Sequence, residues 1–379
     1  MIRTWDVIVV GAGPAGSAAA RACAGAGLSV LCLEEHGTIG HPVQCAGLLS
    51  TNALGECRVS ERSVLHRVSG ARLVSSLGSE LLIDAGRTKA YVVDRGVLDR
   101  EMAWSAADSG AEFRTKTAVC GIGDRTVSTR GVCGHEQFGF RLLLAADGPR
   151  STVARLKGRQ RAKVTLAGIQ AEVLFEMDER FVEIHPDASP SFFAWAIPAG
   201  GGRVRAGLCG TSGVRTCFEA FIARFGGSCL HLVTGALPLG VMPRTYGDRV
   251  LYTGDAAGFA KPTSGGGVYT GVRSARHAAS VAIACCERDS FADADLASYE
   301  RRWKQDLGRE LTLGYRLFEA RQKLSPSDID RIVRTLNDPG IREIITEYGD
   351  MDRPSALIRR LSTKPALVQL IGIFLRTIV

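Results

Sequence analysis

The sequence predicts an α/β protein in which a Rossmann-like domain is interleaved with an antiparallel β-sheet domain and followed by a C-terminal helical segment. Strand–turn–helix patterns occur at 5–27, 141–155 and 249–276, with glycine in each turn. Between the second and third patterns, short β-rich runs separated by turns fill 164–210, including a Gly-rich hairpin at 199–202. Helical periodicity begins near residue 300, and we expect Ser325–Pro326 to be the N-cap and first-turn pair of one helix, with Ser327 as an alternative cap. This succession of elements is the basis of the predicted fold.

The first strand–turn–helix pattern has the order that a dinucleotide site requires. The apolar strand WDVIVV is followed by GAGPAG, with Gly11, Gly13 and Gly16 in the GxGxxG spacing. The first glycine permits a tight turn, the second lets backbone approach a pyrophosphate, and the third lets helix and strand pack closely. A second strand ends at Glu34, whose carboxylate is placed to accept hydrogen bonds from an adenosine ribose. This pattern alone does not distinguish FAD from NAD.

Two later segments supply further turns of the same kind. The run RLLLAADGPRS ends a buried strand at Asp147 and Gly148. The run RVLYTGDAAG ends another strand at Asp255, a residue that can hold a ribityl hydroxyl. A glycine triplet that includes Gly266 and Gly267 then opens a helix, whose free N–H groups can point toward a flavin or its phosphates.

Together, GAGPAG, AADGPRS and YTGDAAG resemble the three fingerprints of the glutathione-reductase-type flavoproteins of the para-hydroxybenzoate hydroxylase branch. This resemblance implies FAD as the cofactor. It narrows to the geranylgeranyl reductase family through IGHPVQCAGLLS, YVVDRGVLD, TAV, SFFAWAIP and KPTSGGGVYTGVRSARHAA, over nearly the whole chain. The family resemblance implies that these residues lie at the FAD site beside the fingerprint residues: Ala15, Glu34, Cys45, Ala46, Gly47, Arg95, Ala118, Val119, Asp255, Gly267 and Val268.

The resemblance also implies a substrate pocket. SFFAWAIP looks like a variant of the family's YxWxFP motif, with Phe193, Trp195 and Ile197 as the expected apolar wall. Core packing along a strand would explain the same alternation. Two departures, Phe193 and Ile197 for aromatic positions of the motif and Gly47 one position early, fall where substrate would lie. The substrate therefore stays open among an archaeal lipid, a quinone, a polyprenol and the chlorophyll side chain.

The expected reaction is the saturation of isoprenoid double bonds, and one residue is the candidate for a catalytic role. Reduced flavin would deliver hydride to one alkene carbon while an acid supplies a proton to the other. Cys45 is the candidate near the reacting carbons, with either a chemical or a steric role. The electron donor stays open among a ferredoxin-like carrier, another reduced carrier and direct NAD(P)H, because no second GxGxxG marks a separate nicotinamide domain.

Three alternatives share the flavin fingerprints. An FAD- and NADPH-dependent aromatic monooxygenase differs only in its pocket segments. An electron-transfer flavoprotein of the quinone-linked kind would carry a cysteine cluster near its C-terminus, whereas the last cysteine here is Cys286. A non-catalytic flavin-binding sensor or scaffold would hold FAD without turnover.

Composition excludes several other classes. The formal net charge is +8, yet no Lys/Arg block resembles a nucleic-acid patch, so no nucleic-acid partner is expected. The eleven cysteines form no CxxC, which favours free thiols in a reducing cytosol. No histidine has the spacing of a metal ligand, and no metal is expected. No stretch reaches the roughly twenty apolar residues that span a bilayer.

The expected domain organisation is discontinuous. We expect the FAD-binding domain over 1–60, 90–165 and 240–300, the substrate domain over 61–89 and 166–239, and the helical region over 301–379. The apolar stretch 364–379 reads as a buried packing helix or as an interfacial anchor. The expected location is cytoplasmic, with the anchor as the argument for peripheral contact at a membrane face.

Overall fold

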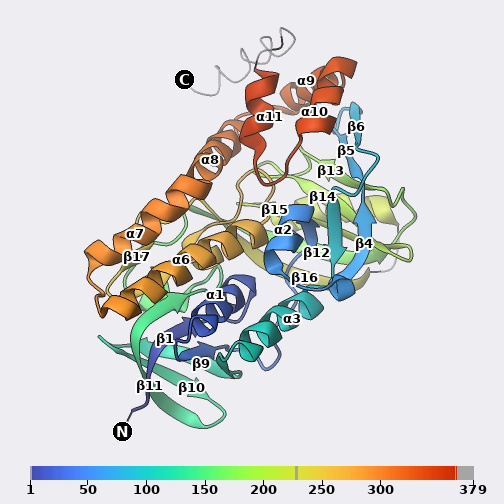
Figure 1. Ribbon diagram of the computed structural model, residues 1–379. Coiled ribbons are helices and arrows are strands. Elements are labelled where there is room, and N and C mark those ends of the chain that lie inside the picture. Colours follow the sequence, from blue (N-terminus) through green and yellow to red (C-terminus); the bar gives the residue numbers. More distant parts are fainter. Residues whose placement is uncertain (1, 227–228, 363, 365–379) are drawn as a thin grey trace.

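The computed structural model describes residues 2–226, 229–362 and 364, and Figure 1 shows three β-sheets with helices packed around them. In that view the N-terminal sheet lies at the bottom, the second large sheet at the right, and the C-terminal helices along the left and top. Apart from Lys364, the stretch 364–379 lies outside the described residues, so both expectations for it stay predictions.

The eight-stranded sheet is built around parallel strands. Its order is β17-β18-β11-β1-β2-β8, with β10 paired to β11 and β9 paired to β10. Strands β8, β2, β1, β11 and β18 run parallel to one another. Parallel strands covered on both faces are apolar throughout, as in the wholly buried run Val7–Val9. The strand bounds are β1 (Thr4–Val10), β2 (Val30–Leu33), β8 (Glu112–Arg114), β9 (Thr117–Ile122), β10 (Thr126–Gly131), β11 (Gly134–Ala145), β17 (Tyr246–Gly247) and β18 (Val250–Tyr252).

Helix α1 packs between α3 and α6 beside this sheet (Figure 1). Its buried residues are small, including Gly16, Ala19 and Ala20, which lets its backbone approach the strands and α6 closely. The shorter helices α2 and α4 have Ser50 and Ser151 as their N-caps, whose hydroxyls accept hydrogen bonds from backbone N–H groups of the first turn. The helix bounds are α1 (Pro14–Gly25), α2 (Thr51–Cys57), α3 (Arg95–Asp108), α4 (Thr152–Leu156) and α6 (Val268–Arg288).

The seven-stranded sheet has the order β16-β12-β15-β14-β13-β5-β6. It is antiparallel except for the parallel pair β13–β5. The hairpin expected at 199–202 is confirmed, since β14 and β15 pair across Gly201 and Gly202. Helix α5 (Val214–Ile222) covers one face through Phe218 and Phe221. The strand bounds are β5 (Gly70–Val74), β6 (Glu80–Asp84), β12 (Val164–Leu174), β13 (Phe181–His185), β14 (Ala194–Gly200), β15 (Arg203–Gly210) and β16 (Cys229–Leu239).

A three-stranded sheet, in the order β3-β7-β4, packs against the other face of the seven-stranded sheet. Its strands are β3 (Leu48–Ser50), β4 (Val64–Val68) and β7 (Ala90–Val93). Val92 and Val68 from this sheet share a buried cluster with Ile197 of β14. The small sheet therefore joins the segment after residue 45 to the second large sheet.

The C-terminal region is helical, as expected. Helix α7 (Asp293–Trp303) continues through a π-helical turn, η4 (Lys304–Gly308), into α8 (Arg309–Arg321), and α9 (Pro326–Leu336), α10 (Pro339–Tyr348) and α11 (Pro354–Leu361) follow. Ser325 forms a capping box with Asp328, which confirms the predicted Ser325–Pro326 start of α9. Helix α9 packs on β6 through Ile329 and Val333.

The observed arrangement confirms the predicted fold class. An α/β unit with a parallel central sheet, a largely antiparallel second sheet and a helical C-terminal region are all present. The division of the chain into exact domain ranges stays a prediction. Among residues 2–226, 229–362 and 364, no helix has the length and apolar character needed to cross a membrane.

Candidate flavin and substrate site

The three glycine-containing segments meet at one edge of the eight-stranded sheet. They follow the carboxyl ends of β1, β11 and β18, which are neighbouring parallel strands. Such edges are where open α/β sheets bind ligands. The structure thus brings together segments that are far apart in the sequence.

The glycines of the first segment lie in three different environments. Gly11 has φ of +96°, and a Cβ there would lie 2.4 Å from the Ala146 carbonyl oxygen. At Gly16 a Cβ would lie 1.9 Å from the Gly11 carbonyl oxygen, so only glycine fits between helix and turn. A Cβ on Gly13 would meet nothing within 4 Å. Gly13 therefore borders the open space into which the N-terminus of α1 points.

Glu34 is held at the end of β2 by three hydrogen bonds. Its Oε2 accepts from the Ala12 N–H at 2.8 Å, and its Oε1 accepts from the His36 N–H at 2.9 Å and from His36 Nδ1 at 2.7 Å. The Glu34 carbonyl accepts from the Thr117 N–H at 2.8 Å, so β9 with Ala118 and Val119 begins beside it. The predicted ribose and adenine residues are therefore neighbours.

Asp147 of the second segment is occupied in capping α4. Its Oδ1 accepts from Ser151 Oγ at 2.7 Å, and its Oδ2 accepts from the Val153 N–H at 2.9 Å. Burial raises the pKa of Asp147, while these hydrogen bonds act to lower it. Gly148 has φ of +74° and, like Gly13, would place a Cβ in open space. The turn positions of the first two segments thus both leave room for close approach, and they follow neighbouring strands of the sheet.

Asp255 of the third segment has the environment of a ligand-binding carboxylate. Burial raises the pKa of Asp255 to about 6, although the positive charge of Arg95 acts in the opposite direction. Among the described residues none donates a hydrogen bond to this carboxylate, whose Oδ1 lies 2.8 Å from where a Cβ on Gly267 would be. A desolvated carboxylate without a donor is a place where a ligand hydroxyl would bind.

The first and third segments touch directly. A Cβ on Gly254 would lie 2.9 Å from the Ala15 Cβ, and one on Gly271 would lie 3.7 Å from the same atom. Gly267 is the N-cap of α6, so Gly266, Gly267 and Val268 place a second helix N-terminus at this opening.

Cys45 lies in the loop before β3, partly exposed, and its Sγ accepts from the Gly47 N–H at 3.3 Å. Arg95, at the start of α3, is fixed by Asp99 through a bidentate pair at 2.9 and 3.0 Å. Burial alone would lower the pKa of Arg95, but the neighbouring Asp99 and Cys45 side chains raise it. Arg95 therefore interacts electrostatically both with the Cys45 side chain and with the Asp255 carboxylate.

Arg205 of β15 supports this loop, and sequence reasoning did not find it. Its Nη1 donates to the Ala46 carbonyl at 2.9 Å and to the Val93 carbonyl at 3.1 Å. A Cβ on Gly47, where φ is +75°, would lie 2.4 Å from the same nitrogen. A buried arginine in the apolar strand RVRAGL was the available signal, since such a charge needs partners.

The three expected pocket residues have different surroundings. Phe193 stacks on Phe192 with ring centroids 4.3 Å apart, and meets the edge of Trp195 at 6.2 Å. Trp195 Nε1 donates to Gln170 Oε1 at 3.0 Å. Ile197 is only 3% exposed and packs with Val92 and Val68, so it belongs to the core between two sheets. Phe193 and Trp195 share a cluster with Tyr315 of α8, and Trp195 also packs against the core that holds Ile197.

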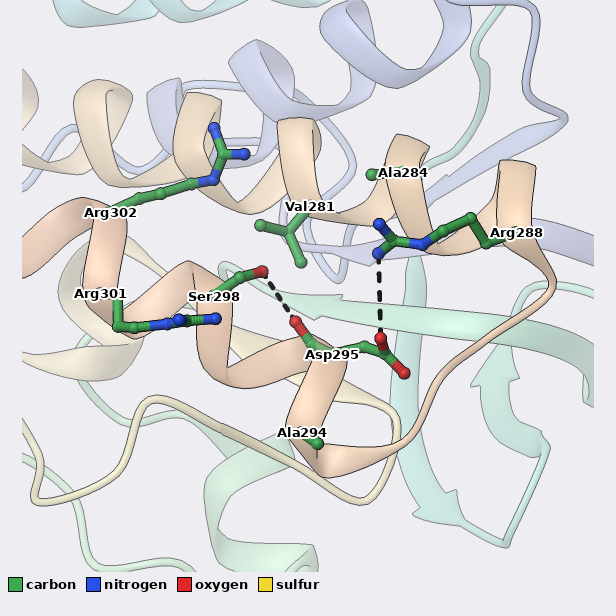
Figure 2. Close-up of a pocket in the computed structure, with 8 residues that line it drawn as sticks. All are labelled: Val281, Ala284, Arg288, Ala294, Asp295, Ser298, Arg301 and Arg302. Atoms are coloured by element: carbon green, nitrogen blue, oxygen red, sulfur yellow. Dashed lines mark hydrogen bonds and ion pairs between the residues drawn. The ribbon is translucent and has the colours of Figure 1, made fainter.

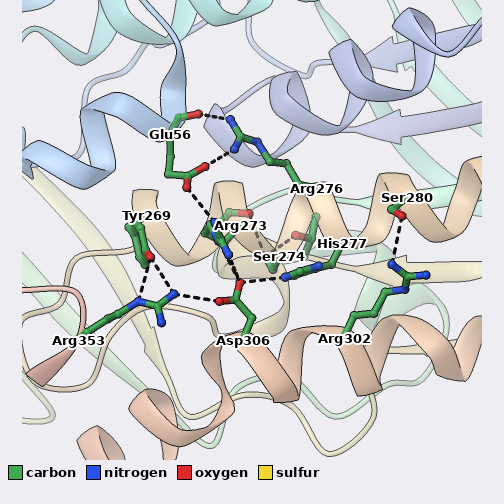
Figure 3. A network of polar contacts seen from close by, with 12 residues as sticks. Glu56, Tyr269, Arg273, Ser274, Arg276, His277, Ser280, Arg302, Asp306 and Arg353 are labelled. Carbon is green, nitrogen blue, oxygen red and sulfur yellow. Dashed lines mark hydrogen bonds and ion pairs between the residues drawn. The ribbon is translucent and has the colours of Figure 1, made fainter. Parts of the chain in front are cut away.

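A polar network lies on the outer side of α6 (Figure 3). Asp306, in the π-helical turn, accepts from Arg273 at 2.7 Å, from His277 at 2.9 Å and from Arg353 at 3.0 Å. Glu56 of α2 accepts from both Arg273 and Arg276. These contacts fasten α2 and the C-terminal region to the helix whose N-terminus faces the opening.

A separate hollow of about 210 Å³ lies between α6 and α7 (Figure 2). It is lined by Arg288, Arg301 and Arg302 together with Asp295, and contains none of the predicted site residues. Across the part of the chain that the structure describes, no group of His, Cys, Asp or Glu side chains could hold a metal ion.

The opening fits FAD on the geometry of its own residues. Two helix N-termini border it, Gly13 and Gly148 leave room for close approach, and Asp255 offers an acceptor to which no residue in the described part of the chain donates. These features define a flavin-dependent oxidoreductase of the Rossmann-like kind. Residues 6–62 match the family model described as FAD dependent oxidoreductase.

Comparison with known proteins identifies the family. The chain is 30% identical to a digeranylgeranylglycerophospholipid reductase of Methanothermobacter thermautotrophicus over 91% of this chain and 94% of that protein. It is 31% identical to an uncharacterized protein of Methanocaldococcus jannaschii over 93% of both chains. The chain belongs to the geranylgeranyl reductase family, that of the archaeal digeranylgeranylglycerophospholipid reductases, and FAD is its cofactor.

Solved structures show the same fold. The crystal structure of a geranylgeranyl bacteriochlorophyll reductase-like protein from Thermoplasma acidophilum has a TM-score of 0.88 at 23% identity, covering 98% of this chain and 100% of that one. A p-nitrophenol 4-monooxygenase from Pseudomonas putida has a TM-score of 0.73 at 18% identity, covering 92% of this chain and 98% of that one. The fold is thus shared by reductases and monooxygenases and does not by itself separate them.

Proposed function

We propose that this protein is an FAD-dependent reductase that saturates carbon–carbon double bonds of geranylgeranyl or longer polyprenyl chains, with a membrane lipid as substrate. The observation that carries this proposal is the 30% identity, over nearly the full length, to a digeranylgeranylglycerophospholipid reductase. When bound and reduced, FAD supplies the hydrogen and electron pair that the alkene receives. The protein's own residues bind the cofactor, orient the chain and exclude water.

Each part of the opening has a proposed task in FAD binding. Gly13, Gly148 and the N-termini of α1 and α6 receive the pyrophosphate, because free N–H groups and the helix dipole favour anions. Glu34 accepts from the ribose hydroxyls, with Ala118 and Val119 beside the adenine. Asp255 accepts from the ribityl chain, and Arg95 holds its guanidinium near the Cys45 loop.

The apolar wall of the substrate pocket is proposed to be Phe193 and Trp195, with Ile197 supporting it from the core. Cys45 is proposed to face the reacting carbons, since it is partly exposed in a loop that Gly47 and Arg205 hold in place. Cys45→Ser tests its role: we expect unchanged FAD affinity and a large loss of turnover. Full turnover with intact FAD binding would remove Cys45 from the chemistry.

The electron donor is proposed to be a ferredoxin-like carrier or NAD(P)H acting directly on the flavin. The two are distinguished by mixing the oxidised protein anaerobically with NADPH alone. Bleaching of the flavin band within seconds would identify the nicotinamide donor. A band that persists until a reduced ferredoxin is added would identify the carrier.

Peripheral contact with a membrane is proposed from the sequence of the C-terminal region. Helix α11 buries none of its residues and carries Arg359 and Arg360 in its last turn. It precedes the apolar stretch 365–379 in the sequence. Basic residues beside an apolar segment favour anionic lipid surfaces. We expect the full chain to sediment with anionic vesicles and a variant ending at Lys364 to remain in solution. Equal sedimentation of both would contradict the proposal.

The central experiment tests the reaction itself. The purified protein is reduced chemically without oxygen, a geranylgeranylated lipid is added, and the oxidised-flavin band and product mass are followed. Return of the band with a product heavier by pairs of hydrogen is the expected result. A flavin that stays reduced with this lipid, but reoxidises with an aromatic acid and oxygen, would replace the reductase with a monooxygenase.

A further inference from the structure

The turn between α10 and α11 contacts residues from other parts of the chain. Lys89 Nζ donates to the Gly349 carbonyl at 2.9 Å, and Arg353 donates to Asp306 at 3.0 Å. Asp350 closes the turn itself by accepting from the Asp352 N–H at 2.7 Å. These contacts place the Asp352 side chain beneath the surface, where the whole residue is 2% exposed.

Asp352 joins two segments that border the proposed FAD site. Its Oδ1 accepts from Lys261 Nζ at 2.5 Å, and its Oδ2 accepts from Ser50 Oγ at 2.5 Å. Ser50 ends β3, the strand that follows the Cys45 loop, and caps α2 by accepting from the Ala53 N–H at 2.9 Å. The buried Asp352 carboxylate therefore links the end of β3, which follows the Cys45 loop, to the segment that contains Lys261.

Lys261 supports the glycine triplet from within. Its backbone N–H donates to the Gly266 carbonyl at 3.1 Å, and its carbonyl accepts from the Gly265 N–H at 2.8 Å. Its side chain passes beside the triplet, because a Cβ on Gly266 would lie 3.2 Å from Cε and 3.5 Å from Nζ. The Lys261 ammonium is thus buried next to the backbone that leads into α6, and its charge is balanced by Asp352.

We propose that Asp352 is a positioning residue that holds the Ser50 and Lys261 segments together and neutralises the Lys261 charge beside the flavin. This inference rests on the proposed FAD site at Gly266 and Gly267. A buried ammonium without its carboxylate favours electron addition to a nearby group, because opposite charges attract strongly where water is excluded. A buried carboxylate without its ammonium disfavours electron addition to the same group. The pair therefore sets the flavin midpoint potential as well as the loop geometry.

The test uses two single variants with opposite net charge. Asp352→Asn leaves the Lys261 ammonium uncompensated, so we expect the FAD midpoint potential to shift upward. Lys261→Met leaves the Asp352 carboxylate uncompensated, so we expect a downward shift. Both midpoint potentials are measured from about pH 6 to about pH 8, and we expect the two shifts to keep opposite signs throughout.

Matched controls separate charge from simple loosening. The double variant Lys261→Met with Asp352→Asn has no uncompensated charge and is expected to return toward the wild-type potential. Lys261→Arg keeps the charge and is expected to stay near it. Asp350→Asn disturbs the same turn without altering the pair and is expected to leave the potential unchanged. Titration of each apoprotein with FAD gives an affinity that does not depend on turnover, and we expect it to fall in both single variants.

The outcomes are distinguishable from failure of the reductase function. Shifts of the same sign in both single variants, or no shift at any pH in the range, would overturn the inference even if the wild type reduces prenyl chains. Opposite shifts in a protein that fails to reduce such chains would support the charge pair and reject the substrate assignment.

Discussion

Asp255 offers a sharp test of the candidate site, because the structure predicts that the same carboxylate destabilises the empty protein and binds the cofactor. Burial raises its pKa from 3.8 to about 6, and none of the described residues donates a hydrogen bond to it. The substitution Asp255→Asn removes the charge and keeps the size of the side chain. We expect it to stabilise the apoprotein and to weaken FAD binding.

The magnitude follows from the pKa difference. A shift from 3.8 to about 6 is about two pKa units, which corresponds to about 3 kcal/mol of unfolding free energy. Because the side chain keeps some solvent exposure, this is an upper limit. Between these two pKa values the folded state binds more protons than the unfolded state, so wild-type stability falls as the pH rises through that window.

The assay is urea unfolding of both apoproteins from about pH 3 to about pH 8. Near about pH 3 the carboxyl is mostly protonated in both states, and we expect the two proteins to be almost equally stable. Above about pH 6 the variant should be more stable by up to about 3 kcal/mol. Asp124→Asn, in the exposed turn between β9 and β10, controls for the loss of one negative charge. A variant that is no more stable than wild type at neutral pH would refute the reasoning.

Two further predictions concern the fingerprint glycines and the loop support. Gly16→Ala should destabilise the apoprotein by several kcal/mol, since its Cβ would lie 1.9 Å from the Gly11 carbonyl oxygen, whereas Gly13→Ala should unfold like wild type and lose FAD affinity. Thermal unfolding and FAD titration separate the two effects, and equal stability losses would contradict the assigned environments. Arg205→Met should slow turnover by freeing the Ala46 carbonyl while leaving the adenine end of FAD bound, so a turnover rate equal to wild type would argue against loop support.

The elements that sequence reasoning predicted correctly depend on local signals. Strand β1, the glycine turn and α1 are specified by neighbouring residues, and the same holds for the Gly201–Gly202 hairpin and the Ser325 cap. Gly11 and Gly16 are required because an added Cβ would clash with a backbone carbonyl oxygen. That oxygen belongs to Ala146 of the adjacent segment for Gly11, and to Gly11 itself for Gly16. Family resemblance supplied Cys45 and Arg95, which no local pattern would have singled out, and their roles at the site stay predictions.

The elements that sequence reasoning missed depend on contacts between distant residues. Arg205 supports a carbonyl 159 residues away, and the parallel β13–β5 pair joins strands from separate segments of the chain. Ile197 packs with Val92 of the small sheet β3-β7-β4, a partner that alternation along one strand cannot reveal, and its place beside the substrate stays a prediction. Asp352 belongs to the same class, because nothing in the local sequence indicates that its carboxylate is buried.

The hydrogen bond from Ser50 to Asp352 joins residues 302 positions apart, which has a consequence for synthesis on the ribosome. At ~5–20 residues per second, Ser50 waits roughly 15–60 seconds before its partner is made. Until then the Lys261 ammonium lacks its carboxylate, and Ser50 at the end of β3 lacks its hydrogen bond to Asp352. A nascent chain can therefore form the first strand–turn–helix early, but the pocket for the cofactor is completed only when almost the whole chain has emerged. Premature release of a truncated chain would leave a protein that has the fingerprints of a flavoprotein without its finished site.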